Sequence, residues 1–219
     1  MCARYVITSP AEAIRALFGY ADRPNFPPRY NVAPTQPIPI VYLERSKRVF
    51  ALARWGFLPS WVKGPHLFSL LVNARGESVN DKPAFRNAMR RRRCLIPADG
   101  FYEWSDTRRR QPFFVRPKDG RPIAFAGLWE TWSGPSGEEV DTAAIAAVDA
   151  TTAAALFVPA SDALLESYEV STAVNRAAND SPDLIAPAPA SSTIADDAAA
   201  AAAEAPENPK EPLRQLSLF

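Results

Sequence analysis

Proline is the residue that most restricts how this chain can fold. The sequence holds 22 prolines among 219 residues, and they are spread along most of its length. Proline lacks a backbone N–H and interrupts helices and central strands, so long regular helices are excluded over most of the chain. Between the prolines lie short runs of β-branched and aromatic residues and a few short helical patterns. We therefore predict an α+β fold, a single β-rich domain of short strands with a few helices.

These runs give the expected strands and helices. Strands are predicted at residues 5–8, 38–43, 49–55, 93–97, 100–104, 113–116 and 123–129, the second and third forming a hairpin. The stretch Ser9-Pro10-Ala11-Glu12 is typical of a helix start, with a serine cap and proline at the first position. We expect this helix to end near Phe18, and a second helix to lie near residues 84–91.

Composition changes near residue 188. Residues 1–188 hold the β-prone runs and suit one domain of ordinary size. Residues 189–219 are rich in alanine, proline, serine and acidic residues without apolar periodicity, which predicts a flexible tail. The net charge of +1 hides an asymmetry, because the tail is acidic and the remainder is basic. Basic residues cluster at 90–93 and 108–110; such clusters are usually solvated faces, but they also suit phosphate contact.

The sequence also argues against several classes of protein. No run is long and apolar enough to span a membrane, and nothing resembles a secretory signal. The two cysteines, Cys2 and Cys94, are too few for a disulfide framework, which predicts a protein of the reducing cytoplasm. One histidine and two distant cysteines argue against a zinc site, so we expect no metal and no cofactor.

The start of the chain, Met1-Cys2-Ala3-Arg4-Tyr5, carries distinctive chemistry. Removal of Met1 would leave Cys2 with a free α-amine, whose pKa near ~8 keeps much of it unprotonated at neutral pH. The thiolate beside this amine is a strong nucleophile. Together they form a 1,2-aminothiol, which captures aldehydes first as an imine and then as a thiazolidine. On these five residues alone, chance is the more frequent reason for a cysteine at position 2.

A carboxylate lies between aromatic residues on the strand predicted at 100–104. Alternation places Tyr102 and Trp104 on one face of this strand, and Phe101 and Glu103 on the other. Glu103 is then either a solvent-facing residue or a buried acid with a raised pKa, suited to proton transfer.

Two further stretches suggest contacts with DNA. Asn73 and Arg75 lie two residues apart, which places an amide and a guanidinium on one face of an extended segment. Trp55, Trp61 and Pro34 are rigid apolar groups on which unpaired bases can stack. Taken singly, such residues are more often parts of a core or a turn.

Together these stretches resemble the SOS response-associated peptidase (SRAP) family. The resemblance rests on residues 1–5, 82–85, 94–100, 111–114, 126–130 and 170–175, and on the motifs Tyr30-Asn31-Val32-Ala33-Pro34, Trp55-Gly56-Phe57-Leu58-Pro59-Ser60-Trp61, Asn73-Ala74-Arg75 and Phe101-Tyr102-Glu103-Trp104. The pieces follow the family order over most of residues 1–188.

The resemblance implies a sensor of abasic sites in single-stranded DNA. Members of the family trap the ring-opened aldehyde as a thiazolidine, and this DNA–protein crosslink protects the lesion during replication and the SOS response. Carried onto this sequence, the resemblance makes Cys2 the nucleophile. It implies that Asn73 hydrogen-bonds near the abasic sugar and that Glu103 transfers protons.

The resemblance also implies the DNA-binding residues and the setting of the protein. Arg4 and Arg75 fit phosphate contacts, and Pro34 and Trp61 fit the stacking surfaces. We expect a monomer of the bacterial cytoplasm, associated with the nucleoid and not with a membrane. The family's older name refers to a proposed peptidase activity, which could be no more than removal of Met1.

The last residues of the chain suggest a protein partner. The pentapeptide at 215–219 resembles the motif that binds the bacterial DNA polymerase sliding clamp. In that motif the side chains matching Gln215, Leu216, Leu218 and Phe219 fill a groove of the clamp. Such a tail would concentrate the domain at replication forks by tethering.

Two departures from the family pattern bear on the chemistry. The family motif begins Met-Cys-Gly-Arg, and here Ala3 replaces the glycine. If that glycine has a positive φ, alanine costs roughly 1 kcal/mol or more and could shift Cys2. The family's His-x-Arg-Met-Pro motif, which carries a catalytic histidine, is missing near residues 149–156. The only histidine of the sequence is His66, which we expect in a surface loop.

Loss of the family histidine bears on mechanism, because the resemblance implies that it assists ring opening and reversal of the crosslink. Aldehyde and aminothiol react without a catalyst, but a missing acid–base group costs on the order of 10²–10⁴ in rate. We therefore expect slow crosslinking and poor reversal. One alternative is a catalytically degenerate module that binds single-stranded DNA or lesions and is tethered to the clamp. Another is a cysteine peptidase, for which the sequence offers no evident histidine partner of Cys2.

Overall fold

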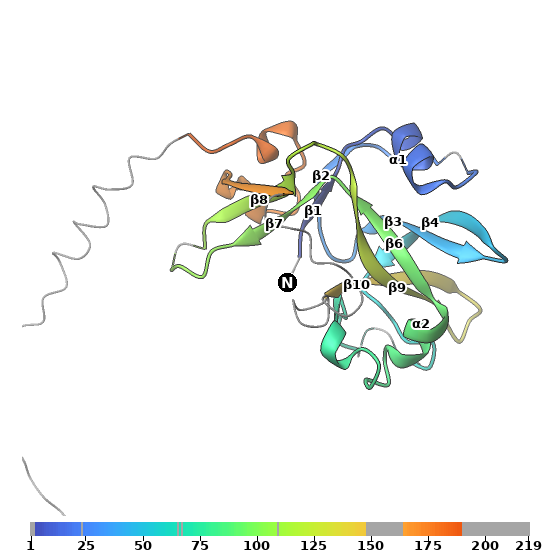
Figure 1. Ribbon diagram of the computed structural model, residues 1–219. Coiled ribbons are helices and arrows are strands. Elements are labelled where there is room, and N and C mark those ends of the chain that lie inside the picture. The colour runs from blue at the N-terminus through green and yellow to red at the C-terminus, as the bar shows by residue number, and fades with distance from the viewer. Residues whose placement is uncertain are drawn as a thin grey trace, which may run out of the picture. The chain divides into compact units, whose positions relative to one another are not determined.

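The computed structural model describes residues 3–22, 24–64, 66, 68–108, 110–147 and 164–189 (Figure 1). By its contacts the chain divides into two compact units, Met1–Pro187 and Ala188–Phe219. All the helices and strands of the described residues belong to the first unit. The catalytic-histidine gap predicted near residues 149–156 and the clamp motif at 215–219 lie outside the described residues.

The first unit consists mainly of short strands. They are β1 (Tyr5–Ile7), β2 (Arg29–Val32), β3 (Pro37–Glu44), β4 (Lys47–Trp55), β5 (Asn73–Arg75), β6 (Arg93–Ala98), β7 (Gly100–Trp104), β8 (Pro112–Pro117), β9 (Ile123–Ser133), β10 (Glu139–Ala147) and β11 (Leu165–Glu169). The α-helices are α1 (Ala11–Phe18) and α2 (Arg86–Arg91), and short 3-10 turns are η2 (Gly76–Ser78), η3 (Thr172–Asn175) and η4 (Pro182–Ile185). The predicted α+β, β-rich fold is confirmed.

The strands form two sheets that lie side by side in Figure 1. One has the order β11-β8-β7-β1-β2, and the other has the order β4-β3-β6-β9-β10-β5. An additional parallel pairing of β4 with β10, through Arg54 opposite Thr142 and Trp55 opposite Ala143, closes five strands of the second sheet into a ring. This closure buries the main core inside a small barrel.

The main core joins the barrel to the N-terminal strand. The ring of Tyr5 contacts the rings of Trp55 and Phe125 edge-on, with centroids 5.5 Å and 6.0 Å apart. Trp55 is fully buried, and its indole Nε1 donates to the carbonyl oxygen of Val72 at 2.9 Å. Of the two interpretations of Trp55, the structural one holds and base stacking does not, because closure of the barrel places this ring inside the core.

The local predictions succeed where the partners are close in sequence. Strands β3 and β4 form the predicted hairpin, paired from Pro37 opposite Arg54 to Glu44 opposite Lys47. The helix α1 ends at Phe18 as predicted, but the serine cap is wrong. The cap position is Pro10, and the hydroxyl of Ser9 donates instead to Asp99 Oδ1 at 2.5 Å.

Candidate functional site

The N-terminal strand lies between β7 and β2 and sets the geometry of the site. Tyr5 pairs with Phe101 in an antiparallel ladder, and the amide of Tyr102 donates to the carbonyl oxygen of Arg4 at 3.0 Å. Continuing this register places Glu103 opposite Ala3. Cys2 and Met1 lie outside the described residues. The candidate acid is therefore carried by the strand that pairs with the start of the chain.

Alternation along β7 fixes the side of the strand on which Glu103 lies. The ring of Phe101 packs against Phe125 of the main core, with centroids 5.7 Å apart. Tyr102 is fully buried on the other face, and Trp104 packs against the same cluster as Tyr102. The predicted alternation is confirmed, so Glu103 is on the face of Phe101. The side chain of Glu103 is half-buried, which lies between the solvent-facing and the buried position that the sequence allowed.

Asn73 and Arg75 come from β5, at the edge of the barrel sheet. Ala74 between them is fully buried, so alternation places both polar side chains on the opposite face of the strand. Asn73 is half-buried with its Oδ1 buried, whereas Arg75 is exposed. The carbonyl oxygen of Val72, the residue before Asn73, accepts a hydrogen bond from the indole of Trp55. The ring of Trp55 in turn contacts the ring of Tyr5. Two consecutive contacts thus connect β5 with β1.

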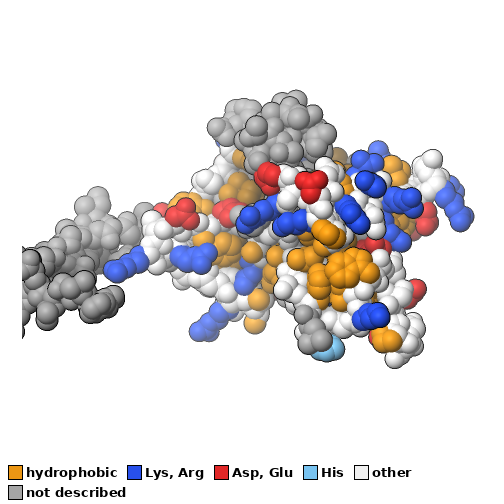
Figure 2. Space-filling view, turned by 90° about the horizontal axis from the view of Figure 1, so that it is seen from below, with side chains coloured by type: hydrophobic (Ala, Val, Ile, Leu, Met, Phe, Trp, Pro, Cys, Tyr) orange, Lys and Arg blue, Asp and Glu red, His pale blue; other side chains and the backbone are white. Residues whose placement is uncertain are grey.

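The proposed stacking groups lie on loops at the surface of the unit. Trp61 is 56% exposed and contacts the ring of Phe68 edge-on, with centroids 5.8 Å apart. Pro34 is half-buried in the turn between β2 and β3. Figure 2 shows a patch of hydrophobic side chains on the face seen from below, with Lys and Arg side chains around it. His66 is exposed, as expected.

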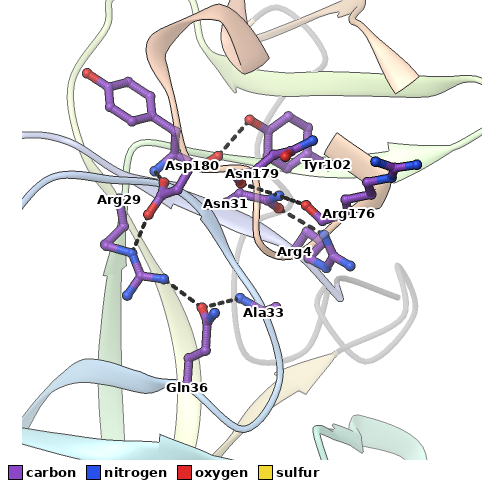
Figure 3. A network of polar contacts seen from close by, with 10 residues as sticks. Arg4, Arg29, Asn31, Ala33, Gln36, Tyr102, Arg176, Asn179 and Asp180 are labelled. Carbon is purple, nitrogen blue, oxygen red and sulfur yellow. Dashed lines mark hydrogen bonds and ion pairs between the residues drawn. The ribbon is translucent and has the colours of Figure 1, made fainter. Parts of the chain in front are cut away.

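Arg4 connects the N-terminal strand with residues 170–185, which we name the closing segment (Figure 3). Its Nη1 donates to Asn31 Oδ1 at 3.0 Å and to the carbonyl oxygen of Val174 at 2.7 Å. Its Nη2 donates to the carbonyl oxygen of Asn175 at 3.2 Å. Burial lowers the pKa of the Arg4 guanidinium, and Tyr102 acts in the opposite direction. Arg4, predicted as a phosphate contact, thus has structural partners as well.

Asn31 is the central residue of this network. It is 0% exposed, and its Nδ2 lies 3.1 Å, 3.0 Å and 2.9 Å from the carbonyl oxygens of Val174, Arg176 and Asn179. An amide nitrogen carries two hydrogens, so it can make direct bonds to two of these oxygens at once. We name this set of contacts the Asn31 latch: Arg4, Asn31 and the carbonyl groups that they bind.

Further bonds hold the closing segment on both sides of the latch. Asp180 accepts from Arg29 Nε at 2.6 Å and from the amide of Tyr30 at 2.5 Å. The indole of Trp104 donates to Asn175 Oδ1 at 2.8 Å. A hollow of about 340 Å³ beside these contacts is lined by Ala3, Arg4, Trp104, Arg110 and Asn175. The start of the chain is therefore held against β7 and the closing segment together.

Sequence reasoning did not identify the latch. Asn31 lies inside one of the motifs that carry the family resemblance, and Asn175 ends another. Membership in those motifs was the signal that could have pointed to the latch, but no role was assigned to the side chains of Asn31 and Asn175. Asp180 lies outside every quoted motif, and only its contacts with β2 reveal its function in the fold.

The second cysteine is in a different environment from the site. Cys94 is buried, and burial raises the pKa of its thiol to about 12. A thiol that stays protonated at neutral pH is a poor nucleophile. Within the described residues, no group of three or more His, Cys, Asp or Glu side chains is arranged to hold a metal ion. Nor does the described part of the chain contain a helix long and apolar enough to cross a membrane.

Comparison with solved structures identifies the fold. A crystal structure of a protein from Bacteroides thetaiotaomicron superposes with a TM-score of 0.75, covering 85% of this chain and 100% of that chain, at 19% identity. At this identity the likeness defines the fold alone.

Comparison of sequences identifies the family. The model of the family described as SOS response associated peptidase (SRAP) matches residues 1–157, and the chain therefore belongs to the SRAP family. It is 35% identical over 150 residues to the abasic site processing protein YoqW of Bacillus subtilis, covering 66% of this chain and 67% of YoqW. It is 27% identical over 200 residues to the abasic site processing protein HMCES of Rattus norvegicus, covering 68% of this chain and 57% of HMCES.

Proposed function

We propose that this protein senses abasic sites in single-stranded DNA and captures them covalently through Cys2. Its relatives YoqW and HMCES are named abasic site processing proteins, which supports this class of substrate. The observation that carries the proposal is the pairing of β1 with β7, in which Tyr5 lies opposite Phe101 and the amide of Tyr102 donates to the carbonyl oxygen of Arg4. Continued by two residues, this register would bring Glu103 opposite Ala3, the neighbour of Cys2 in the sequence. Glu103 would then be a proton-transfer group near the proposed aminothiol.

The chemistry needs no external reagent beyond the lesion itself. After removal of Met1, the Cys2 amine adds to the aldehyde carbon of the ring-opened sugar and water leaves, giving an imine. The Cys2 sulfur then adds to the imine carbon while a proton moves to the nitrogen, closing the thiazolidine. The net reaction joins aldehyde and aminothiol with release of one water.

Two polar residues are assigned to this reaction. Glu103 would protonate the departing hydroxyl when the imine forms and accept a proton when the ring closes. Asn73 would hydrogen-bond to the sugar hydroxyl and orient the aldehyde. Its Oδ1 is buried, and the preceding residue, Val72, is held by the hydrogen bond from the Trp55 indole. Both roles are proposals, and Asn73→Ala and Glu103→Gln variants would test them as reductions in crosslinking rate.

The DNA strand would bind across the face that surrounds these groups. Exposed Arg75 suits a phosphate, and exposed Trp61 with Pro34 suits stacking of bases or the end of a duplex. We also assign a phosphate contact to Arg4. Because its Nη atoms already bond to the latch, we expect Arg4→Ala to reduce protein stability as well as DNA binding.

Covalent capture is tested with abasic-site single-stranded DNA and protein in which loss of Met1 is confirmed by mass spectrometry. We expect an adduct that survives denaturing electrophoresis and disappears in Cys2→Ser. Cys94→Ala is the matched control, because this cysteine is buried away from solvent and its loss should leave adduct formation intact. An adduct that forms equally well in Cys2→Ser would refute the assignment.

The same experiment separates the alternative function. The sequence lacks the family's His-x-Arg-Met-Pro motif, which favours a degenerate module that binds lesions without chemistry. Normal DNA binding without an adduct after long incubation would support that alternative. A slow adduct would support capture without the assistance of that histidine, with a rate lower by about 10²–10⁴. Turnover of a peptide substrate would instead support a peptidase.

Recruitment by the bacterial sliding clamp is a separate proposal. Gln215, Leu216, Leu218 and Phe219 would occupy the clamp groove, with the acidic and alanine-rich residues before them as a leash. Binding to a purified clamp should be lost when Leu218 and Phe219 are replaced by alanine, and retained in the control Ser217→Ala. We further propose that the protein is a monomer, which sedimentation would test.

A further inference from the structure

A groove of about 660 Å³ lies between α1, the outer face of β3 and β6, and the start of β9. Its apolar walls include Leu17, Val41, Leu43, Leu95 and Ile123. None of these residues belongs to the candidate DNA site or to the latch. We name this hollow the leucine groove.

The leucine side chains of this groove are exposed to solvent. Leu17, Leu43 and Leu95 are 53%, 70% and 44% exposed. Along β6 the residues flanking Leu95 are buried, so Leu95 and exposed Arg93 share the outward face of the barrel. Single exposed leucines need no explanation, but several lining one hollow are typical of an interaction surface.

The apolar surface continues beyond the groove. A second hollow of about 240 Å³ shares Leu17, Pro122 and Ile123 with it, and adds the apolar Pro117, Leu164 and Leu165 and the charged Asp119 and Arg121. An elongated apolar surface of this kind suits several successive side chains of one bound segment, as in helix-in-groove recognition.

The positive charge around the leucine groove favours a partner segment that carries negative charge. Three arginines, Arg48, Arg91 and Arg93, line it, and no carboxylate is among the described residues that line it. Arg48 is fixed by donating to the carbonyl oxygen of Phe18 at 2.9 Å, whereas Arg91 and Arg93 are exposed. A ligand segment with acidic residues beside its apolar ones would complement these guanidinium groups.

The lining distinguishes a peptide from a nucleic acid. Bases are held mainly by stacking on aromatic faces, whereas the exposed apolar side chains of this groove are aliphatic. We propose that the leucine groove docks a segment of a partner protein that carries Leu or Phe side chains flanked by Asp or Glu. Because the groove shares no residue with the DNA site, docking and lesion binding can occur on one molecule.

The proposal is tested by selecting random peptides displayed on phage against the immobilised full-length protein. Binders are counter-selected on a Leu43→Glu, Leu95→Glu double variant, whose changes fall on exposed positions. We expect enriched peptides that combine Leu or Phe with Asp or Glu, and affinities about tenfold lower for the double variant by fluorescence anisotropy. Arg93→Glu should weaken the same peptides. Leu52→Glu is the matched control, since Leu52 is exposed on β4 outside the groove lining and should leave binding unchanged.

Four outcomes would overturn the proposal. Selection could yield no peptide that depends on Leu43 and Leu95, or it could enrich basic sequences. Sedimentation could show a wild-type dimer that the double variant loses, which would make a second copy of the chain the occupant. Undamaged single-stranded DNA could lose affinity in the double variant and not in the control, which would make the groove a nucleic-acid surface. Retention of Cys2-dependent crosslinking in the double variant would show that a binding loss is not caused by unfolding.

Discussion

Replacing Asn31 by leucine should reduce stability more than any exposed substitution of the same kind. Leucine branches at Cγ as asparagine does but has no polar atom, and its larger side chain also crowds this fully buried position. It would remove the acceptor of Arg4 Nη1 and the donor that serves the carbonyl groups of Val174, Arg176 and Asn179. Since Asn31 is fully buried, water cannot replace these bonds without opening the structure.

The expected magnitude follows from the number of bonds that the amide can make at once. Two N–H bonds and one carbonyl oxygen serve partners that are buried or partly buried, and each such partner left unsatisfied costs up to about 1–3 kcal/mol. The gain in apolar burial offsets part of this, so we expect Asn31→Leu to lower the free energy of unfolding by about 3–5 kcal/mol. That is a large fraction of the roughly 5–15 kcal/mol of a typical domain.

Urea unfolding followed by tryptophan fluorescence measures this change. Asn80→Leu is the control, because Asn80 is exposed and its replacement should stay within about 0.5 kcal/mol of the wild type. Hydrogen exchange at the amides of residues 173–176 should accelerate in Asn31→Leu even where the protein remains folded. A loss below about 1 kcal/mol, with unchanged exchange in the closing segment, would refute the reasoning that Asn31 carries the latch.

Three further predictions concern buried or strained residues. Burial raises the pKa of Glu130, so the folded state retains this proton to a higher pH than the unfolded chain. The free energy of unfolding should then fall as the pH rises through the interval between the two pKa values, and Glu130→Gln should reduce that fall in urea titrations at several pH values. Iodoacetamide near neutral pH should leave Cys94 unmodified in the native protein and alkylate it only in urea, because burial raises its pKa to about 12; peptide mapping would detect either result. Gly56→Ala should lower the melting temperature, because φ is 141° there and a Cβ atom would collide with Leu70, costing about 1–3 kcal/mol.

Much of the fold was predictable wherever the determining partners are neighbours in sequence. The hairpin of β3 and β4 follows from two β-prone runs joined by a short turn, and the alternation along β7 follows from the strand period. The serine cap failed because Asp99, 90 residues away, competes for the Ser9 hydroxyl. A local pattern carries no information about such a distant acceptor.

The residues of the candidate site were proposed from the sequence, but the contacts that hold them in place were not predictable. Asn73 and Glu103 were proposed through their motifs, but the pairing of β5 with β10 and of β7 with β1 that positions them is not specified by any local pattern. The burial of Trp55 results from closure of β4 onto β10, which a local pattern does not specify. Asn31 was missed since its partners are main-chain carbonyl groups 143 to 148 residues further on, which any sequence could provide.

The Asn31 latch has a consequence for the order of events during synthesis. Arg4 leaves the ribosome well before its partner Val174, which follows 170 residues later. At about 5–20 residues per second, roughly 10–30 seconds pass before the two can meet. Throughout that interval Arg4 has no closing segment to bind. Synthesis of Arg4 and closure of the latch are thus separated in time by the length of the chain between them.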